Sequence, residues 1–257
     1  MLQIALPSYG IKSYCRAVDE FNDYKILTTH ESEIINKLFV PDEGDVVIDA
    51  GSHIGLFSII SAKRLGASGK VISIEADFST YQMLEANIHL NDLNNVKVVN
   101  CILYSKDMSF SLSNYEAILS AGRRGGIAEQ EREQRKQEEQ IQKSAASNRL
   151  EFQNALTLDS VLENAMGSVK PVNWIKIDVE GGELDVLKGG ARTLAENQNI
   201  AILIEVHRSW LYRPILDLLY KQGFELLWER IYGGEIIYGH ILVSKSHLNS
   251  ADLPVQN

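Results

Sequence analysis

The amino-acid sequence predicts an α/β fold: a doubly wound, mostly parallel sheet of seven strands with helices on both faces. Short apolar runs rich in β-branched residues alternate along the chain with segments of helical periodicity, a pattern typical of parallel sheets covered by helices. The last two runs, residues 224–228 and 236–243, are joined by a short connection that contains Gly233 and Gly234. This connection predicts an antiparallel hairpin at one edge of the sheet.

The length of 257 residues fits one large domain with appendages. We expect residues 1–40 to be an N-terminal helical lead-in, with a helix at 32–39, and residues 41–257 to form the main domain. A segment rich in Glu, Gln, Lys and Arg interrupts this domain at about residues 120–148. Because it has almost no apolar stripe, we expect a helical or disordered insertion outside the core. It is either a lid or partner-facing arm, or a solvated spacer.

Composition and charge disfavour several classes of protein. The formal net charge of −9 argues against a protein that coats nucleic acid. Cys15 and Cys101 are the two cysteines, too few for a disulfide framework, and neither has metal-ligand spacing. No segment approaches the roughly 20 apolar residues needed to span a bilayer, and the N-terminus lacks a basic region. We therefore expect a cytoplasmic protein without a membrane span.

The first predicted strand, residues 46–50, leads into a glycine-bearing turn and a helical pattern that starts at Leu56. Gly51 and Gly55 bracket this turn, where the backbone must take a positive φ or let a ligand approach closely. A strand, a glycine turn and a helix N-terminus together typically hold a nucleotide-like cofactor.

The second predicted strand, residues 70–75, ends in Glu75, which lies 24 residues after Gly51. At this spacing an acidic side chain commonly binds the ribose hydroxyls of a nucleotide. One carboxylate suits that task because it accepts a charge-assisted hydrogen bond from each of two hydroxyls. A helix at 78–90 and a third strand at 96–100 complete a β-α-β-α-β unit.

Beyond a short strand at 108–112 and the charged insertion, the pattern of the core resumes. Thr157 is placed to cap a short helix, and residues 174–178 form a strand that again ends in an acid. A second glycine turn follows, and a helical pattern at 184–194 precedes the strand at 200–207.

Acidic residues end several of these predicted strands. Right-handed crossovers place the carboxyl ends of parallel strands on one rim of the sheet, where ligands of open α/β sheets bind. Apolar strands that repeatedly end in charge are hard to explain by folding alone. We therefore expect a site at this rim, formed by Asp49, Glu75, Asp178 and the pair Glu205 and His207.

The successive motifs are residues 47–55, Glu75, Asn87 with Asn91, and residues 157–159, 176–183 and 204–207. Together they resemble the FkbM family of S-adenosylmethionine-dependent methyltransferases, over about residues 26–243 without the insertion. The K-I-D-V-E-G-x-E pattern at 176–183 is the most specific part. The resemblance implies a Rossmann-like class I methyltransferase sheet and, as in members that act on sugars, polyketides or lipid-linked glycans, methylation of a hydroxyl. His53 departs from the small amide residue usual in the turn.

The residues themselves support this cofactor. A nicotinamide cofactor would prefer G-x-G-x-x-G, whereas here an acid, Asp49, precedes a turn with two glycines. S-adenosylmethionine has no pyrophosphate and carries an ammonium group that an acid can bind. Glu31, ahead of the first helix, is either a helix-capping acid or a cofactor contact. The predicted cofactor-binding residues are Glu31, Asp49, Gly51, Ser52, His53, Gly55, Glu75, Ala76 and Asp178.

The expected chemistry is in-line transfer of the sulfonium methyl group to a hydroxyl of a small-molecule or glycan substrate. The predicted catalytic residues are Asp178, Glu180 and His207: Glu180 or His207 takes the hydroxyl proton, and Asp178 orients substrate or cofactor. Alternatively, Asp178 with Glu205 or His207 holds a divalent metal that activates the hydroxyl. The other interpretations are structural: Glu180 and Glu183 lie at a helix N-terminus, and His207 is a hydrogen-bonded histidine at a strand end.

Two further functions fit the same fold. One is methylation of a nitrogen or of RNA, although the acidic balance and the lack of a basic stripe argue against RNA. The other is a binding or scaffold protein that has lost catalysis. The sequence leaves the acceptor and the oligomeric state open.

Overall fold

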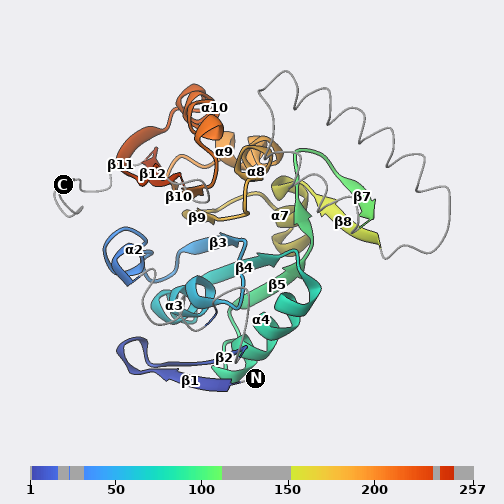
Figure 1. The fold of residues 1–257 in the computed structure, drawn as a ribbon, viewed down its shortest axis with the longest axis vertical. Coiled ribbons are helices and arrows are strands. Elements are labelled where there is room, and N and C mark those ends of the chain that lie inside the picture. Colours follow the sequence, from blue (N-terminus) through green and yellow to red (C-terminus); the bar gives the residue numbers. More distant parts are fainter. Residues whose placement is uncertain (1, 17–22, 24–31, 112–151, 234–237, 246–257) are drawn as a thin grey trace.

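The structure is a computed structural model that describes residues 2–16, 23, 32–111, 152–233 and 238–245 (Figure 1). Its strands are β1 (Leu2–Leu6), β2 (Ile11–Cys15), β3 (Val46–Ala50), β4 (Lys70–Glu75), β5 (Val96–Asn100), β6 (Ile102–Leu103), β7 (Met108–Ser111), β8 (Phe152–Leu156), β9 (Trp174–Ile177), β10 (Ala201–Val206), β11 (Glu225–Ile231) and β12 (Gly239–Ser244). Its helices are α2 (Ser32–Lys37), α3 (Leu56–Leu65), α4 (Phe78–Leu90), α7 (Leu158–Met166), α8 (Glu183–Gly189), α9 (Ala191–Glu196) and α10 (Ser209–Lys221), with a 3-10 turn η1 (Pro7–Tyr9).

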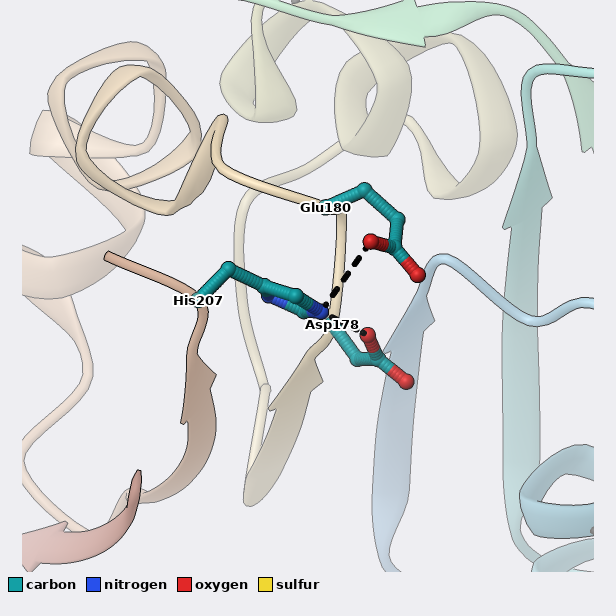
Figure 2. Close-up of side chains that lie close together, drawn as sticks. All are labelled: Asp178, Glu180 and His207. Atoms are coloured by element: carbon teal, nitrogen blue, oxygen red, sulfur yellow. Dashed lines mark ion pairs between the residues drawn. The ribbon is translucent and has the colours of Figure 1, made fainter. Parts of the chain in front are cut away.

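The main sheet has seven strands in the order β11-β12-β10-β9-β3-β4-β5. The strands from β5 to β10 pair in parallel, whereas β12 runs antiparallel to both of its neighbours, β10 and β11. This confirms the predicted sheet and its C-terminal hairpin. Because β9 and β10 are parallel neighbours, Asp178 and His207, which follow them, lie side by side on one rim (Figure 2).

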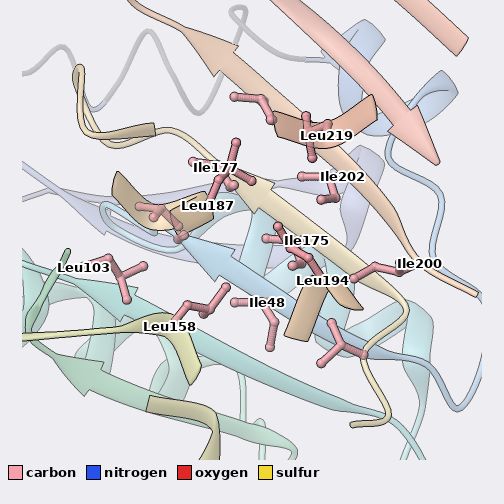
Figure 3. Packing of buried hydrophobic residues seen from close by; sticks show 14 of the residues in the cluster. Ile48, Leu103, Leu158, Ile175, Ile177, Leu187, Leu194, Ile200, Ile202 and Leu219 are labelled. Carbon is pink, nitrogen blue, oxygen red and sulfur yellow. The ribbon is translucent and has the colours of Figure 1, made fainter. Parts of the chain in front are cut away.

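Alternate residues of the central strands build two separate cores. Ile48, Ile175 and Ile202 face α7, α8, α9 and α10 in one core, part of which is drawn in Figure 3. Val47 and Trp174, one position away on β3 and β9, face α2, α3 and the N-terminal strands in the other. The near-continuous apolar character of these strands therefore follows from burial on both faces.

The N-terminal lead-in is only partly helical, which differs from the prediction. β1 and β2 form an antiparallel hairpin, and a helix follows at α2, inside the range expected for it. The hairpin packs on α4 through two side-chain amides. Asn87 Oδ1 accepts from Tyr14 N at 2.6 Å and Asn91 Oδ1 accepts from Lys12 N at 3.0 Å. Asn87 Nδ2 also donates to Ile54 O at 2.8 Å, which ties α4 to the turn after β3.

Two other features correct or extend the prediction. β7 was expected, but it belongs to a small sheet of order β6-β8-β7 whose other strands were not. The expected single helix at 184–194 is two helices, because Gly189 and Gly190 interrupt it. At Gly189 a side chain has no room, since a Cβ would lie 2.2 Å from Tyr104 O.

The charged insertion at about residues 120–148 falls outside the described residues, and the boundary between lead-in and main domain stays a prediction. None of the helices in the described part of the chain has the length and apolar character needed to cross a bilayer. The expected cytoplasmic location likewise stays a prediction.

Two glycine turns touch at the rim: the first glycine turn, residues 51–55, and the second, residues 179–183. Gly51 has φ +79°, and a Cβ there would lie 1.7 Å from Asp178 O. We expect Gly51→Ala to lower the free energy of unfolding by about 3 kcal/mol, because a left-handed residue and a backbone clash are combined.

Urea unfolding followed by circular dichroism measures this loss. Gly223→Ala is the matched control, because Gly223 has φ +85° but nothing within 4 Å of a Cβ. It should cost about 1 kcal/mol, from the left-handed conformation alone. Equal losses in the two variants would show that the contact between the turns does not matter.

Candidate active site

The first glycine turn connects β3 to α3 and is fastened to the neighbouring strand β4. Gly51 N and Ser52 N both donate to Ile74 O at 3.0 Å, and Ser52 Oγ accepts from Ile74 N at 2.9 Å. Gly51, His53 and Gly55 all have positive φ, of 79°, 50° and 99°. The turn is therefore tight, with three residues in the left-handed region, and its backbone is held by hydrogen bonds to β4.

His53 lies between two carboxylates. The backbone N–H of His53 donates to Glu75 Oε2 at 2.9 Å, and the backbone N–H of Asp77 donates to Glu75 Oε1 at 2.8 Å. Burial raises the pKa of Glu75, although these two hydrogen bonds oppose the rise. On its other side, His53 Nε2 lies 3.2 Å from Asp23 Oδ1. Burial opposes ionisation of Asp23, but hydrogen bonds from His53 and Arg16 hold its pKa well below the ordinary value.

Lys176 joins the two glycine turns. Its Nζ donates to Gly51 O at 2.8 Å and pairs with Asp178 Oδ2 at 3.2 Å and with Asp49 Oδ1 at 3.5 Å. Asp49 stands opposite Lys176 in the pairing of β3 with β9. Its other oxygen accepts from Ser58 Oγ at 2.5 Å. Asp49 is wholly buried, so it supports the turn from within the sheet.

Asp178, Glu180 and His207 meet beyond the ends of β9 and β10 (Figure 2). His207 Nε2 lies 3.6 Å from Asp178 Oδ1 and 3.4 Å from Glu180 Oε2. Glu180 reaches this position because it adopts a left-handed conformation, with φ 56°. The side chain of His207 is 2% exposed, whereas that of Glu180 is 70% exposed. The cluster is thus open to solvent at Glu180.

Further carboxylates surround His207. Its Nδ1 donates to Glu183 Oε1 at 2.9 Å, an oxygen that also accepts from Gly181 N at 2.7 Å. Glu205 Oε1 lies 3.6 Å from His207 Nε2, while Glu205 Oε2 pairs with His240 Nε2 at 2.9 Å. Burial opposes protonation of His207, but hydrogen bonds to Glu180 and Glu183 outweigh it and raise its pKa to about 11. With no ligand bound, His207 is therefore a cation at neutral pH.

The two acids beside His207 are ionised. Burial opposes ionisation of Asp178, but the charges of Lys176 and His207 hold its pKa below the ordinary value. The hydrogen bond with His207 lowers the pKa of Glu180, again against the effect of burial. This rim of the sheet is consequently rich in negative charge.

The structure brings the predicted residues together in two groups. Gly51, Ser52, His53 and Gly55 form the first glycine turn, with Glu75 bonded to it and Ala76 beside Glu75. Asp178, Glu180 and His207 form the second group. Glu31 lies outside the described residues.

Sequence reasoning assigned no role to Lys176 or His240, and it gave Glu183 only a place at a helix N-terminus. For Lys176 one signal was available in the sequence: it is a charged residue within an apolar strand that is predicted to be buried. The roles of Glu183 and His240 depend on packing between elements that are distant in the sequence.

Two known proteins are similar to this chain in sequence. The chain is 29% identical over 168 residues to "Methyltransferase 1" of Beauveria bassiana, across 62% of this chain and 65% of that protein, just under two thirds of its length. It is 27% identical over 218 residues to "Methyltransferase sdnD" of Sordaria araneosa, across 80% of this chain and 82% of that protein.

Among solved structures, Trm5b from Pyrococcus abyssi matches with a TM-score of 0.51 and 15% identity, over 91% of this chain and 53% of that chain. At this identity the likeness concerns the fold alone. The family described as "Methyltransferase FkbM domain" matches residues 49–226, from the acid before the first glycine turn to β11. The match covers both groups of site residues and more than half of the chain, which therefore belongs to the FkbM methyltransferase family.

Proposed function

We propose that this protein transfers the methyl group of S-adenosylmethionine to a hydroxyl of a small molecule, sugar, glycan or lipid-linked acceptor. One observation carries the proposal. Lys176 Nζ binds Gly51 O at 2.8 Å and Asp178 at 3.2 Å. The turn that we assign to the cofactor therefore adjoins the acids that we assign to the acceptor, as a direct transfer between two bound reactants requires.

On the cofactor side, we assign the first glycine turn and Ala76 to the nucleoside and Glu75 to its ribose hydroxyls. Each oxygen of Glu75 accepts one backbone hydrogen bond and keeps a lone pair for a further donor. We assign Asp49 an indirect role, because its carboxylate is buried, accepts a hydrogen bond from Ser58 and lies 3.5 Å from Lys176 Nζ.

On the acceptor side, the hydroxyl oxygen bonds to the methyl carbon as the carbon–sulfur bond breaks. The sulfur keeps that electron pair and becomes a neutral thioether, and the hydroxyl proton passes to Glu180. We assign the proton to Glu180 rather than His207, because both nitrogens of His207 already face carboxylates. Positioning supplies most of the rate, since the pKa of Glu180 is lowered and makes it a weak base.

Among the alternative acceptors, RNA fits this rim less well. RNA would bring phosphates close to the carboxylates of Asp178, Glu180 and Glu205, which is unfavourable without a basic surface. A nitrogen acceptor would give an N-methyl product instead of an O-methyl product. Mass spectrometry of a cell extract incubated with labelled cofactor identifies the product. A scaffold without catalysis requires no cofactor at all, so absence of S-adenosylmethionine binding in calorimetry would favour that reading and contradict the proposal.

Glu75→Gln tests the cofactor site. The neutral amide keeps the shape of the side chain but loses the charge-assisted hydrogen bonds to ribose, so the Kd for S-adenosylmethionine should rise at least about tenfold. Isothermal titration calorimetry measures it. Glu225→Gln is the control, because Glu225 is exposed and starts β11 at the opposite rim of the sheet. Unchanged affinity in Glu75→Gln would contradict the ribose assignment.

Glu180→Gln tests the acceptor side. It should keep the affinity for S-adenosylmethionine and lower the transfer rate by about 10²–10⁴-fold, as expected when a proton acceptor is removed. The assay follows labelled methyl from the cofactor into a panel of hydroxyl-bearing compounds. Full turnover in this variant would exclude Glu180 as the proton acceptor and leave the cofactor assignment intact.

A further inference from the structure

Asp178, Glu180 and His207 present three metal-binding atoms to a common point. They come from the end of β9, the second glycine turn and the end of β10, and one ligand atom of each lies within 4.8 Å of the others. Two ligands bound at right angles to an ion at about 2.1–2.3 Å lie roughly 3.0–3.3 Å apart. The distances from His207 Nε2 to the two carboxylates, 3.4 and 3.6 Å, exceed that spacing by a few tenths of an ångström.

The second, independent observation is the hydrogen bond behind the imidazole. A metal-binding histidine typically donates its other ring nitrogen to a carboxylate, which fixes the ring and increases its basicity. Here His207 Nδ1 bonds to Glu183 Oε1 at 2.9 Å, and that oxygen is itself fixed by Gly181 N at 2.7 Å. Glu183 is fully buried. The ring is therefore held with Nε2 directed at Asp178 and Glu180, as Figure 2 shows.

The negative charge around His207 also favours binding of a cation. Four carboxylates, those of Asp178, Glu180, Glu183 and Glu205, have an oxygen within 3.6 Å of a ring nitrogen of His207. His207 and Lys176 offset them only in part. Carboxylates gathered at this density are stabilised by a bound metal ion.

The geometry points to a divalent-cation site with Asp178, Glu180 and His207 as ligands and Glu183 as the positioning residue of His207. The ion takes the place of the proton on His207 Nε2, which is released to water. Two carboxylates and one imidazole suit a hard or borderline ion, for which Mn²⁺ is the probe. Glu205 is not included, because His240 already holds one of its oxygens at 2.9 Å.

The role of the ion in catalysis rests on the proposed function. Bound to the ion, the acceptor oxygen is more acidic and loses its proton through the exposed carboxylate of Glu180 to water. The oxygen then forms its bond to the methyl carbon while the carbon–sulfur bond breaks, and the sulfur leaves with the electron pair. The ion is neither oxidised nor reduced.

The test treats the 257-residue chain with EDTA and then measures its binding of Mn²⁺ by calorimetry and by the electron paramagnetic resonance of free Mn²⁺. We expect one site in the native protein and in Glu225→Gln. Glu180→Gln and Asp178→Asn should each raise the Kd for Mn²⁺ at least tenfold. Glu183→Gln should raise it about 10–100-fold, as removal of such a supporting carboxylate does. Urea unfolding confirms that each variant is folded, and Glu180→Gln, at an exposed turn, is the decisive one.

Absence of Mn²⁺ binding at millimolar concentration, or equal binding by the native protein and Glu180→Gln, overturns the inference. Assays with S-adenosylmethionine separate this from failure of the proposed function. If the cofactor binds and methyl transfer runs equally fast with EDTA and with Mn²⁺, the catalytic role of the ion is wrong and the proposed function stands. If Mn²⁺ binds at these residues but S-adenosylmethionine does not bind, the proposed function is wrong and the metal site stands.

Discussion

The ammonium group of Lys176 is the interaction on which the site depends. It is buried within the sheet, where an unpaired charge would be very unfavourable, and it is matched by the carboxylates of Asp49 and Asp178. Its third contact, with Gly51 O, fixes the distance between the two glycine turns. Ser58, at the start of α3, binds the far side of Asp49. A short polar path therefore runs from α3 through β3 to β9 beneath the rim.

Lys176 lies at one carboxylate oxygen of Asp178, and His207 lies at the other. One carboxylate, Glu183, fixes its ring, while Glu180 and Asp178 lie at the opposite nitrogen. A buried histidine among carboxylates takes either a proton or a metal ion at that nitrogen, because the surrounding negative charge favours both. The orientation of the ring is the same in the two cases.

Much of the fold could be predicted because its signals are local. The strands ending at Glu75 and before Asp178 are apolar runs with clear turn residues after them, and parallel pairing alone brings their ends to one rim. That rule placed Asp178 and His207 together without knowledge of any contact. The hairpin of β1 and β2, the strand β8 and the functions of Lys176 and Glu183 were missed. The pairing of β1 with β2 is local, but the partners of β8, Lys176 and Glu183 are distant in the sequence, and no local pattern reveals them.

The side-chain amides of Asn87 and Asn91 act toward β2 as a further strand would, since each bonds to both the N–H and the carbonyl of one β2 residue. These partners are 73 and 79 residues apart in the chain. During synthesis on the ribosome, the hairpin therefore emerges first and remains with this edge unpaired until α4 has followed it. Because Asn87 also binds Ile54 O, the arrival of α4 completes the hairpin edge and the first glycine turn in the same step.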